Sequence, residues 1–238
     1  MTAPQLDLNH KDSSMPIKRI IRGLNEFQIN YFSVHQEMFR QLSQGQAPEI
    51  LFITCSDSRI DPNLLTQTQP GELFIIRNLG NIIPPHGNNN NSEGAGIEYA
   101  VSALNIKHII VCGHSHCGSM KGLLQLPNLV DEMPLVYDWL KYHAESTRRL
   151  LRENYQDYDG EKLLRIAIEE NILTQIENLE TYPVIRSKLH SNKLSLHAWL
   201  YEIETGNIFA YDAQQSKFVI LRSEAFPVPD PLATLQPN

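Results

Sequence analysis

Three side chains that can bind a transition metal follow two apolar runs of the chain. Residues 50–53 lead to Cys55, and residues 109–112 lead to His114 and Cys117. Two thiolates and an imidazole suit Zn²⁺ and leave the fourth position of a tetrahedral site open. An open position is typical of a catalytic zinc site, so these residues predict a catalytic centre with one zinc ion per chain.

Asp57 and Arg59 stand close behind the first of these ligands. They alternate with Cys55, and in extended backbone this spacing places the three side chains on one side. An arginine can hold a carboxylate through two parallel hydrogen bonds and so direct its other lone pairs toward a metal. We therefore predict a catalytic role for this pair; an ordinary surface ion pair is the alternative interpretation.

The elements that must position these residues alternate between strands and helices. Apolar residues at 51–53, 73–76 and 108–112 predict strands that are buried on both faces, as in a parallel sheet. Helical patterns separate or follow them, and ligands gather at the carboxyl ends of such strands. We expect an α/β fold with a central, mostly parallel sheet flanked by helices.

Other segments complete this picture. Apolar residues recur in steps of three and four over residues 17–43 and predict one long N-terminal helix. Residues 194–203 and 208–211 predict strands that form a C-terminal hairpin, with residues 217–221 as an edge strand. The remaining expectations are a surface loop at 81–91, a helix at 94–104 capped by Ser92, two linked helices within 135–151, and a helix at 161–179.

Length and composition limit the domain organisation and the class of partner. With 238 residues and 42% hydrophobic content, the chain can bury one sizeable core. We predict a mobile arm at 1–15, a single α/β zinc enzyme domain at 16–222, and a Pro-rich tail at 223–238. A net charge of −7 argues against nucleic acid or an anionic membrane surface as partner.

The cysteine content and the absence of long apolar runs bear on location. Three cysteines without a disulfide spacing favour a reducing compartment. No run approaches the roughly 18 apolar residues of a membrane span, and residues 1–15 lack the apolar core of a signal peptide. We therefore expect a cytoplasmic protein.

Several motifs of the chain resemble those of one enzyme family. Residues 55–59, Cys-Ser-Asp-Ser-Arg, and residues 113–118, Gly-His-Ser-His-Cys-Gly, resemble the two signature motifs of the β-carbonic anhydrases. The resemblance covers residues 17–221 and is greatest to the plant and cyanobacterial branch. Residues 135–140 and 170–175 also resemble the carboxysomal enzymes of cyanobacteria.

This resemblance implies the zinc-dependent, reversible hydration of carbon dioxide to bicarbonate and a proton. Zinc held by Cys55, His114 and Cys117 would lower the pKa of its bound water, and the resulting hydroxide would attack carbon dioxide. Asp57, fixed by Arg59, would orient that hydroxide. In the family the matching aspartate can itself bind zinc when its arginine partner is lost, which closes the site.

The resemblance also assigns a substrate pocket. It gives Gln46 a hydrogen bond to the substrate, Gly118 a backbone N–H near the site, and Phe74, Leu79 and Tyr99 an apolar wall around carbon dioxide. On the residues alone, the two aromatic side chains would be core residues, which is the more common placement of aromatic residues. We expect Phe74 and Tyr99 to complete the pocket of a neighbouring subunit.

The resemblance further implies an assembly and a cellular role. We expect a homodimer that builds a higher assembly, a place in inorganic carbon supply for carbon fixation, and location inside carboxysomes through a scaffold protein. The segment after residue 222 looks short for such recruitment. Two alternatives remain open: a carbon disulfide or carbonyl sulfide hydrolase on the same fold, and a non-catalytic zinc-stabilised protein that binds a scaffold.

Overall fold

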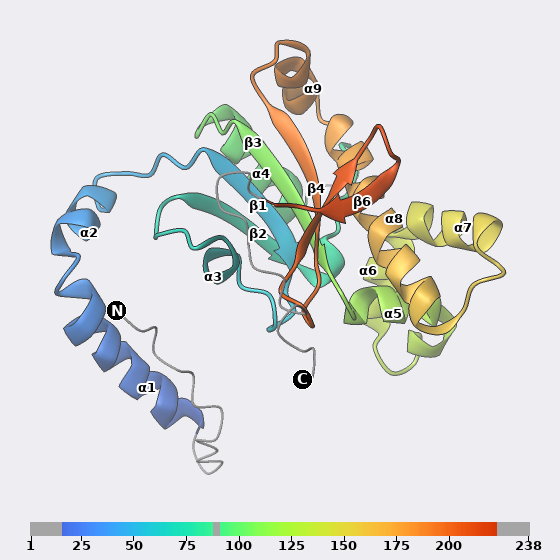
Figure 1. Cartoon of the computed structure of the whole chain (residues 1–238), viewed down its shortest axis with the longest axis horizontal. Coiled ribbons are helices and arrows are strands. Elements are labelled where there is room, and N and C mark those ends of the chain that lie inside the picture. The colour runs from blue at the N-terminus through green and yellow to red at the C-terminus, as the bar shows by residue number, and fades with distance from the viewer. Residues whose placement is uncertain (1–15, 88–90, 223–238) are drawn as a thin grey trace, which may run out of the picture. The chain divides into compact units, whose positions relative to one another are not determined.

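A single mixed sheet carries the residues of interest (Figure 1). In the computed structural model, which describes residues 16–87 and 91–222, six strands are ordered β2-β1-β3-β4-β5-β6. The first four are parallel and the last two antiparallel, as the sequence predicts. The strands are β1 (Ile50–Cys55), β2 (Leu73–Asn78), β3 (His108–His114), β4 (Ser195–Tyr201), β5 (Ile208–Asp212) and β6 (Lys217–Ile220).

The order of the strands explains why the predicted metal ligands converge. The chain passes from β1 to β2 on one side and then returns to β3 on the other side of β1. This reversal is a topological switch point, where the carboxyl ends of neighbouring strands leave a crevice between their connections. Thr54 pairs with Cys112 in register, so the residues that follow β1 and β3 emerge side by side.

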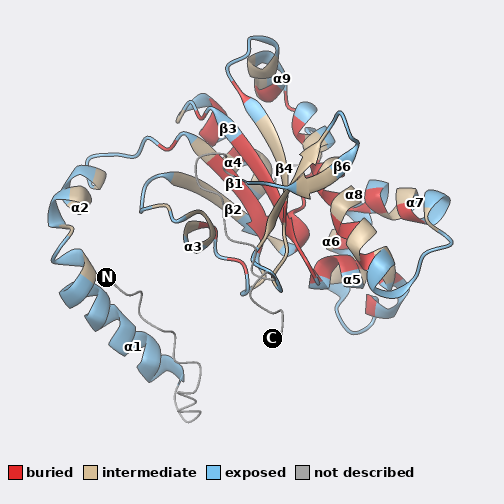
Figure 2. Cartoon of the chain, in the orientation of Figure 1, coloured by how far each residue is buried: buried red, intermediate tan, exposed pale blue. Residues whose placement is uncertain are grey.

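Helices cover both faces of the sheet. The larger core lies between the sheet and a layer that includes α4 (Ser92–Ser102), α5 (Gly118–Leu124) and α8 (Gly160–Glu180). The opposite face carries a smaller cluster with Phe52 and Cys112, against which Leu65 of α3 (Pro62–Thr66) packs. Burial is therefore greatest in the central strands β1 and β3 (Figure 2).

Outside this layer, short helices follow one another. They are η3 (Leu126–Leu129), α6 (Pro134–His143) and α7 (Glu145–Asn154), and α7 contacts α8. The predicted pair of helices within 135–151 is confirmed. The helix at 161–179 is also found, but a further helix, α9 (Pro183–His190), follows it, because a proline at the first position of a helix is favourable.

The chain divides into two compact units, Met1–Gln46 and Ala47–Asn238. The predicted arm at 1–15, the tail at 223–238 and residues 88–90 lie outside the described residues. The prediction of a single domain at 16–222 therefore stays a prediction.

The predicted single helix at 17–43 is wrong. The structure has α1 (Pro16–Glu26), a π-helical turn η1 (Phe27–Phe32) and a separate α2 (Gln36–Leu42). The Ser33 hydroxyl donates to the Ile29 carbonyl and the His35 ring to the Tyr31 carbonyl, at 2.8 Å in the second case. Polar side chains that bond to backbone in this way compete with regular helical hydrogen bonds, and an apolar pattern does not reveal this.

The predicted surface loop at 81–91 is wrong in its first part. Asn81, Ile82 and Ile83 are almost completely buried. Asparagines and prolines usually indicate exposed turns, but here other side chains satisfy the backbone groups of the segment, which allows its burial. The predicted cap of α4 is displaced by one residue, because the Asn91 side chain, not that of Ser92, accepts from the Gly94 N–H.

Candidate metal centre

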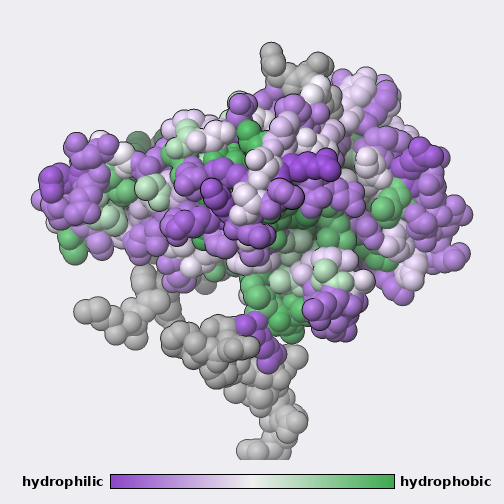
Figure 3. Space-filling view, turned by 90° about the horizontal axis from the view of Figure 1, so that it is seen from above, coloured by the Kyte–Doolittle hydropathy of each residue, from purple (hydrophilic) through white to green (hydrophobic). Residues whose placement is uncertain are grey.

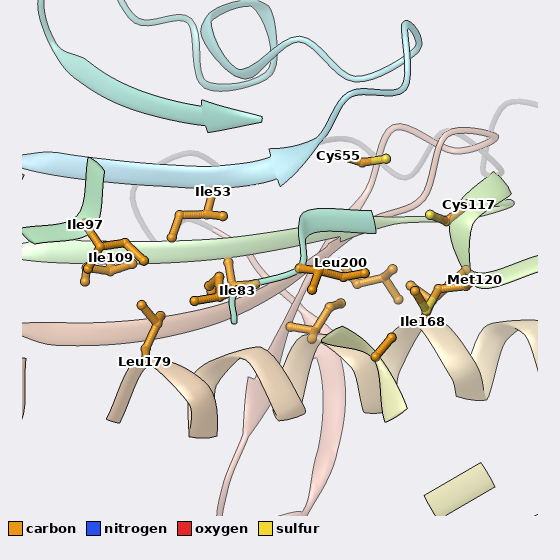
Figure 4. Close-up of a cluster of buried hydrophobic side chains, with 14 of the residues drawn as sticks. Ile53, Cys55, Ile83, Ile97, Ile109, Cys117, Met120, Ile168, Leu179 and Leu200 are labelled. Atoms are coloured by element: carbon orange, nitrogen blue, oxygen red, sulfur yellow. The ribbon is translucent and has the colours of Figure 1, made fainter. Parts of the chain in front are cut away.

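The three predicted metal ligands lie together at the carboxyl edge of the sheet. Cys55 ends β1, His114 ends β3, and Cys117 directly precedes α5. Their ligand atoms all lie within 4.8 Å of one another, and all three side chains are buried. Figure 4 shows the two thiols at the same end of the buried cluster.

His114 is prepared to bind a metal. Its Nδ1 lies 2.8 Å from the Ser115 carbonyl, which can only accept, so Nδ1 carries the proton and Nε2 has a free lone pair. Among the described residues, this buried Nε2 has no hydrogen-bond partner. Histidines that bind metals commonly donate their other N–H to a carbonyl in this way, so the residues present fit a zinc ion.

The two thiols influence each other's ionisation. The Cys117 thiol, as hydrogen-bond donor, lowers the pKa of Cys55 to about 4, and the Gly80 N–H, 3.4 Å from Cys55 Sγ, contributes in the same direction. The same thiol pair and burial raise the pKa of Cys117. Because two adjacent thiolates repel each other, the second ionisation needs a nearby cation, which a bound metal provides.

Asp57 and Arg59 form the predicted pair of parallel hydrogen bonds. Arg59 Nε donates to Asp57 Oδ1 at 2.9 Å, and Arg59 Nη2 donates to Oδ2 at 2.7 Å. Asp57 Oδ2 lies 3.8 Å from His114 Nε2, so the carboxylate faces the cluster of ligands. The Arg59 guanidinium holds the pKa of Asp57 well below its usual range, which keeps the carboxylate charged.

A second arginine, Arg77, fixes the loop between Cys55 and the end of the Asp57–Arg59 segment. Its Nε donates to the Cys55 carbonyl at 3.1 Å, and its Nη2 donates to the carbonyls of Asp57 at 2.7 Å and Ile60 at 2.9 Å. Sequence reasoning missed this role. Its only signal was a charged residue near the end of an apolar strand.

The loop that carries His114 and Cys117 is held from the β4–β5 turn. Glu204 accepts a hydrogen bond from the Ser115 hydroxyl at 2.8 Å, and its carboxylate also contacts His116 Nε2. The His116 carbonyl accepts from Arg59 Nη2 at 3.2 Å, which links the two loops. No sequence pattern indicated Glu204, because it lies 89 residues from Ser115.

Some of the predicted pocket residues lie close to the metal-ligand cluster, and others lie away from it. Leu79 directly follows β2, and Gly118 begins α5 directly after Cys117. Phe74 and Tyr99 contact each other, with ring centroids 5.9 Å apart. Phe74 pairs with Leu51, four residues before the end of β1, so it lies about 13 Å along the strand from the ligands of the same chain. Gln46 is exposed and ends the N-terminal unit.

Comparison with known proteins identifies the family of the chain. A family model described as carbonic anhydrase matches residues 50–208. The solved structure of the β-carbonic anhydrase CcaA is 58% identical, with a TM-score of 0.84 over 86% of this chain and 99% of that one. The chain belongs to the β-carbonic anhydrase family. This confirms the predicted family and fold, and the enzyme class, whose reaction is the hydration of carbon dioxide.

Relatives place this β-carbonic anhydrase among several bacterial and fungal ones. A carbonic anhydrase of Synechocystis is 58% identical over 87% of this chain and 75% of its own length. One of Synechococcus elongatus is 57% identical over 81% of this chain and 70% of its own. A tetrameric enzyme of Sordaria macrospora is 30% identical, with a TM-score of 0.72 over 82% of this chain and 95% of its own. In the described part of the chain, no helix is long and apolar enough to span a membrane.

Proposed function

We propose that Cys55, His114 and Cys117 bind one zinc ion and that this centre hydrates carbon dioxide. The observation that carries the proposal is the unpartnered His114 Nε2, on an imidazole ring that has a nitrogen within 4.8 Å of both buried thiol sulfurs. A buried imidazole nitrogen without a partner is costly, and a metal ion would satisfy it. A structural zinc site would need a fourth protein ligand, and among the described residues the grouping has three.

The chain's own residues would then serve the reaction around this metal. When bound, zinc supplies a Lewis acid that makes water nucleophilic at neutral pH. Asp57 would accept a hydrogen bond from the attacking water, and Arg59, which donates to both carboxylate oxygens, would keep the carboxylate from turning toward the metal. Because both Asp57 oxygens are held by Arg59, the carboxylate is not free to fill the fourth metal position. This arrangement favours catalysis over a permanently closed structural zinc site.

The substrate pocket is proposed to involve two subunits. Leu79 and Gly118 follow the elements that carry the ligands, and Gln46 would bond to the substrate. Phe74 lies about 13 Å along the sheet from the ligands of its own chain, and Tyr99 of α4 contacts it there, which supports the action of both at the site of a second copy.

A homodimer, assembled further into larger oligomers, is proposed on the same grounds. Exposed apolar side chains are frequent in α1 and η1, and a stable protein normally covers such residues. Apolar patches also interrupt the hydrophilic surface drawn in Figure 3. The residues in these helices are Ile17, Ile20, Ile21, Leu24, Phe27, Ile29 and Phe32.

The physiological role is proposed from the relatives. Two cyanobacterial carbonic anhydrases are 57–58% identical, which supports a role in inorganic carbon supply for carbon fixation and location in carboxysomes through a scaffold protein. Co-purification of a tagged chain with carboxysomes from Synechococcus elongatus would support this role. Recovery only in the unassembled cytoplasmic fraction would contradict the carboxysome location.

Stopped-flow measurement of carbon dioxide hydration, together with metal analysis, tests the proposed site. We expect activity with one zinc per chain and negligible turnover of carbonyl sulfide and carbon disulfide. Stoichiometric zinc without hydration activity would instead favour the non-catalytic interpretation. Faster turnover of a sulfur substrate would identify the hydrolase alternative.

A further inference from the structure

The turn after β2 brings a backbone donor to one of the proposed ligands. In η2 (Leu79–Asn81), the Gly80 N–H lies 3.4 Å from Cys55 Sγ. Gly80 has φ +82°, a left-handed conformation that favours glycine. A Cβ at this position would come within 3.0 Å of Ser119 Cβ and 3.3 Å of Met120 Cε, so the turn is closely packed against α5.

A row of amide side chains on α8 holds this turn from the other side. Asn171 Nδ2 donates to the Gly80 carbonyl at 2.9 Å, and Gln175 Nε2 donates to Asn171 Oδ1 at 3.0 Å. Gln175 Oε1 accepts from the Ile83 N–H at 2.7 Å, and Asn178 Nδ2 donates to the Ile83 carbonyl at 2.8 Å. We call these three side chains the amide ladder; their spacing of four and three residues places them on one helix face.

Burial makes the amide ladder unlike an ordinary polar helix face. Asn171 and Gln175 are 1% and 0% exposed, beside a core of leucine and isoleucine side chains. Buried amides are costly unless they are hydrogen bonded, and an apolar residue of similar size would pack at these positions without that cost. Figure 4 shows Ile83 between the sheet and α8, within the same cluster as Ile53 and Leu179.

The bonds of the amide ladder have one common target. Those that leave the helix end on the Gly80 carbonyl and on the backbone of Ile83, directly after the Gly80 N–H that approaches Cys55. Residues 170–175, which include Asn171 and Gln175, form one of the stretches whose sequence resembles the carboxysomal enzymes. Neither the metal ligands nor the Asp57–Arg59 pair accounts for the sequence of this stretch.

We propose that Asn171 and Gln175 are positioning residues for the metal centre: they hold Gly80 so that its N–H donates to the Cys55 sulfur. The inference rests on the proposed role of Cys55 as a zinc ligand. A hydrogen bond to a thiolate withdraws charge from the sulfur and orients it, so it affects how the sulfur binds a metal. Outer partners of metal ligands commonly change metal affinity by about 10 to 100-fold when removed.

The variant Asn171→Ala tests this inference in the zinc-loaded enzyme. We expect competition with a chromophoric chelator to show zinc binding weakened by about tenfold or more. In the cobalt-substituted enzyme, the thiolate-to-cobalt charge-transfer band should move to lower energy, because the sulfur loses a hydrogen-bond donor. Asn171→Ser, whose hydroxyl is too short to reach the Gly80 carbonyl, replaces this variant if Asn171→Ala does not fold.

Tyr182→Phe is the matched control. The Tyr182 hydroxyl is buried and donates to the Pro84 carbonyl at 2.7 Å, just beyond the turn. Its loss removes a comparable bond from the same segment but leaves Gly80 held. We expect a lowered melting temperature with unchanged zinc affinity and an unchanged cobalt band.

The outcomes separate the two proposals. If the Asn171 variant loses thermal stability but keeps the wild-type zinc affinity and cobalt band, the amide ladder is merely structural and the inference is wrong. If the wild-type enzyme itself binds no stoichiometric zinc, the proposed metal centre fails, and the inference fails with it.

Discussion

Replacing Arg59 with alanine tests the proposed site most directly. The change removes both hydrogen bonds from the guanidinium to Asp57, at 2.9 and 2.7 Å, and leaves the three proposed metal ligands untouched. Asp57 Oδ2 already lies 3.8 Å from His114 Nε2. Once released, the carboxylate can turn to the open metal position, where it would displace the water that must react.

The expected loss follows from these contacts. A hydrogen bond to a charged group contributes about 1.5–3 kcal/mol. The Arg59 side chain is 46% exposed, so solvent screening favours the lower end of that range. About 1.5 kcal/mol corresponds to roughly a tenfold shift toward metal binding by Asp57. The attacking water also loses the carboxylate that orients it, which lowers the rate by a further factor of about 10 to 100. The two factors multiply to a predicted fall in kcat/KM of roughly 100 to 1,000-fold.

Stopped-flow hydration assays and metal analysis measure the two consequences separately. Arg59→Ala should keep one zinc per chain while it loses activity, and the double variant Asp57→Ala with Arg59→Ala should recover part of the rate. Such a recovery is strongly non-additive, as expected for residues that act on one another.

A remote ion pair provides the control. Arg149 Nε donates to Glu153 at 2.7 Å on α7, and both side chains are exposed, so Arg149→Ala should leave activity unchanged. Near wild-type hydration by Arg59→Ala at neutral pH would refute the reasoning. The Asp57–Arg59 pair would then be an ordinary loop ion pair.

Three further predictions concern the metal, the thiols and the assembly. Chelation should abolish activity; folded, fully active protein with less than about a tenth of an equivalent of zinc would exclude a zinc mechanism. Thiol reagents should label Cys55 and Cys117 only after chelation. Burial raises the pKa of Cys112 to about 12, so Cys112 should be labelled only after unfolding. Rapid labelling of Cys112 in the native enzyme would contradict this. Analytical ultracentrifugation at micromolar concentration should show a dimer or larger, and an active monomer would contradict both the interface and the shared pocket.

The parts of the site that could be predicted are those encoded locally. The apolar runs before Cys55 and His114 identify strands buried on both faces, and the residues that follow such strands must lie at the carboxyl edge of the sheet. Strand order was not predictable from these runs. It is the observed reversal between β1 and β3 that brings the two motifs side by side.

The parts that could not be predicted depend on long-range contacts or on local competition for hydrogen bonds. Glu204 and Asn171 act on segments 89 and 91 residues away, and their own surroundings in sequence are those of an ordinary turn and helix. The Ser33 hydroxyl donates a hydrogen bond to the Ile29 carbonyl of the N-terminal segment, and the apolar pattern of that segment gives no sign of this bond. Periodicity indicates which face is apolar, but not where a side chain replaces a backbone bond.

The burial of the segment after β2 also depends on long-range hydrogen bonds, which local composition does not reveal. Composition predicts exposure because asparagine and proline suit turns in water, yet a buried turn is stable when its backbone groups have partners. Here α8 supplies those partners through side chains that are themselves buried and mutually bonded. The turn can therefore lie inside the core and present the Gly80 N–H to Cys55, which a solvent-exposed loop could not hold in a fixed position.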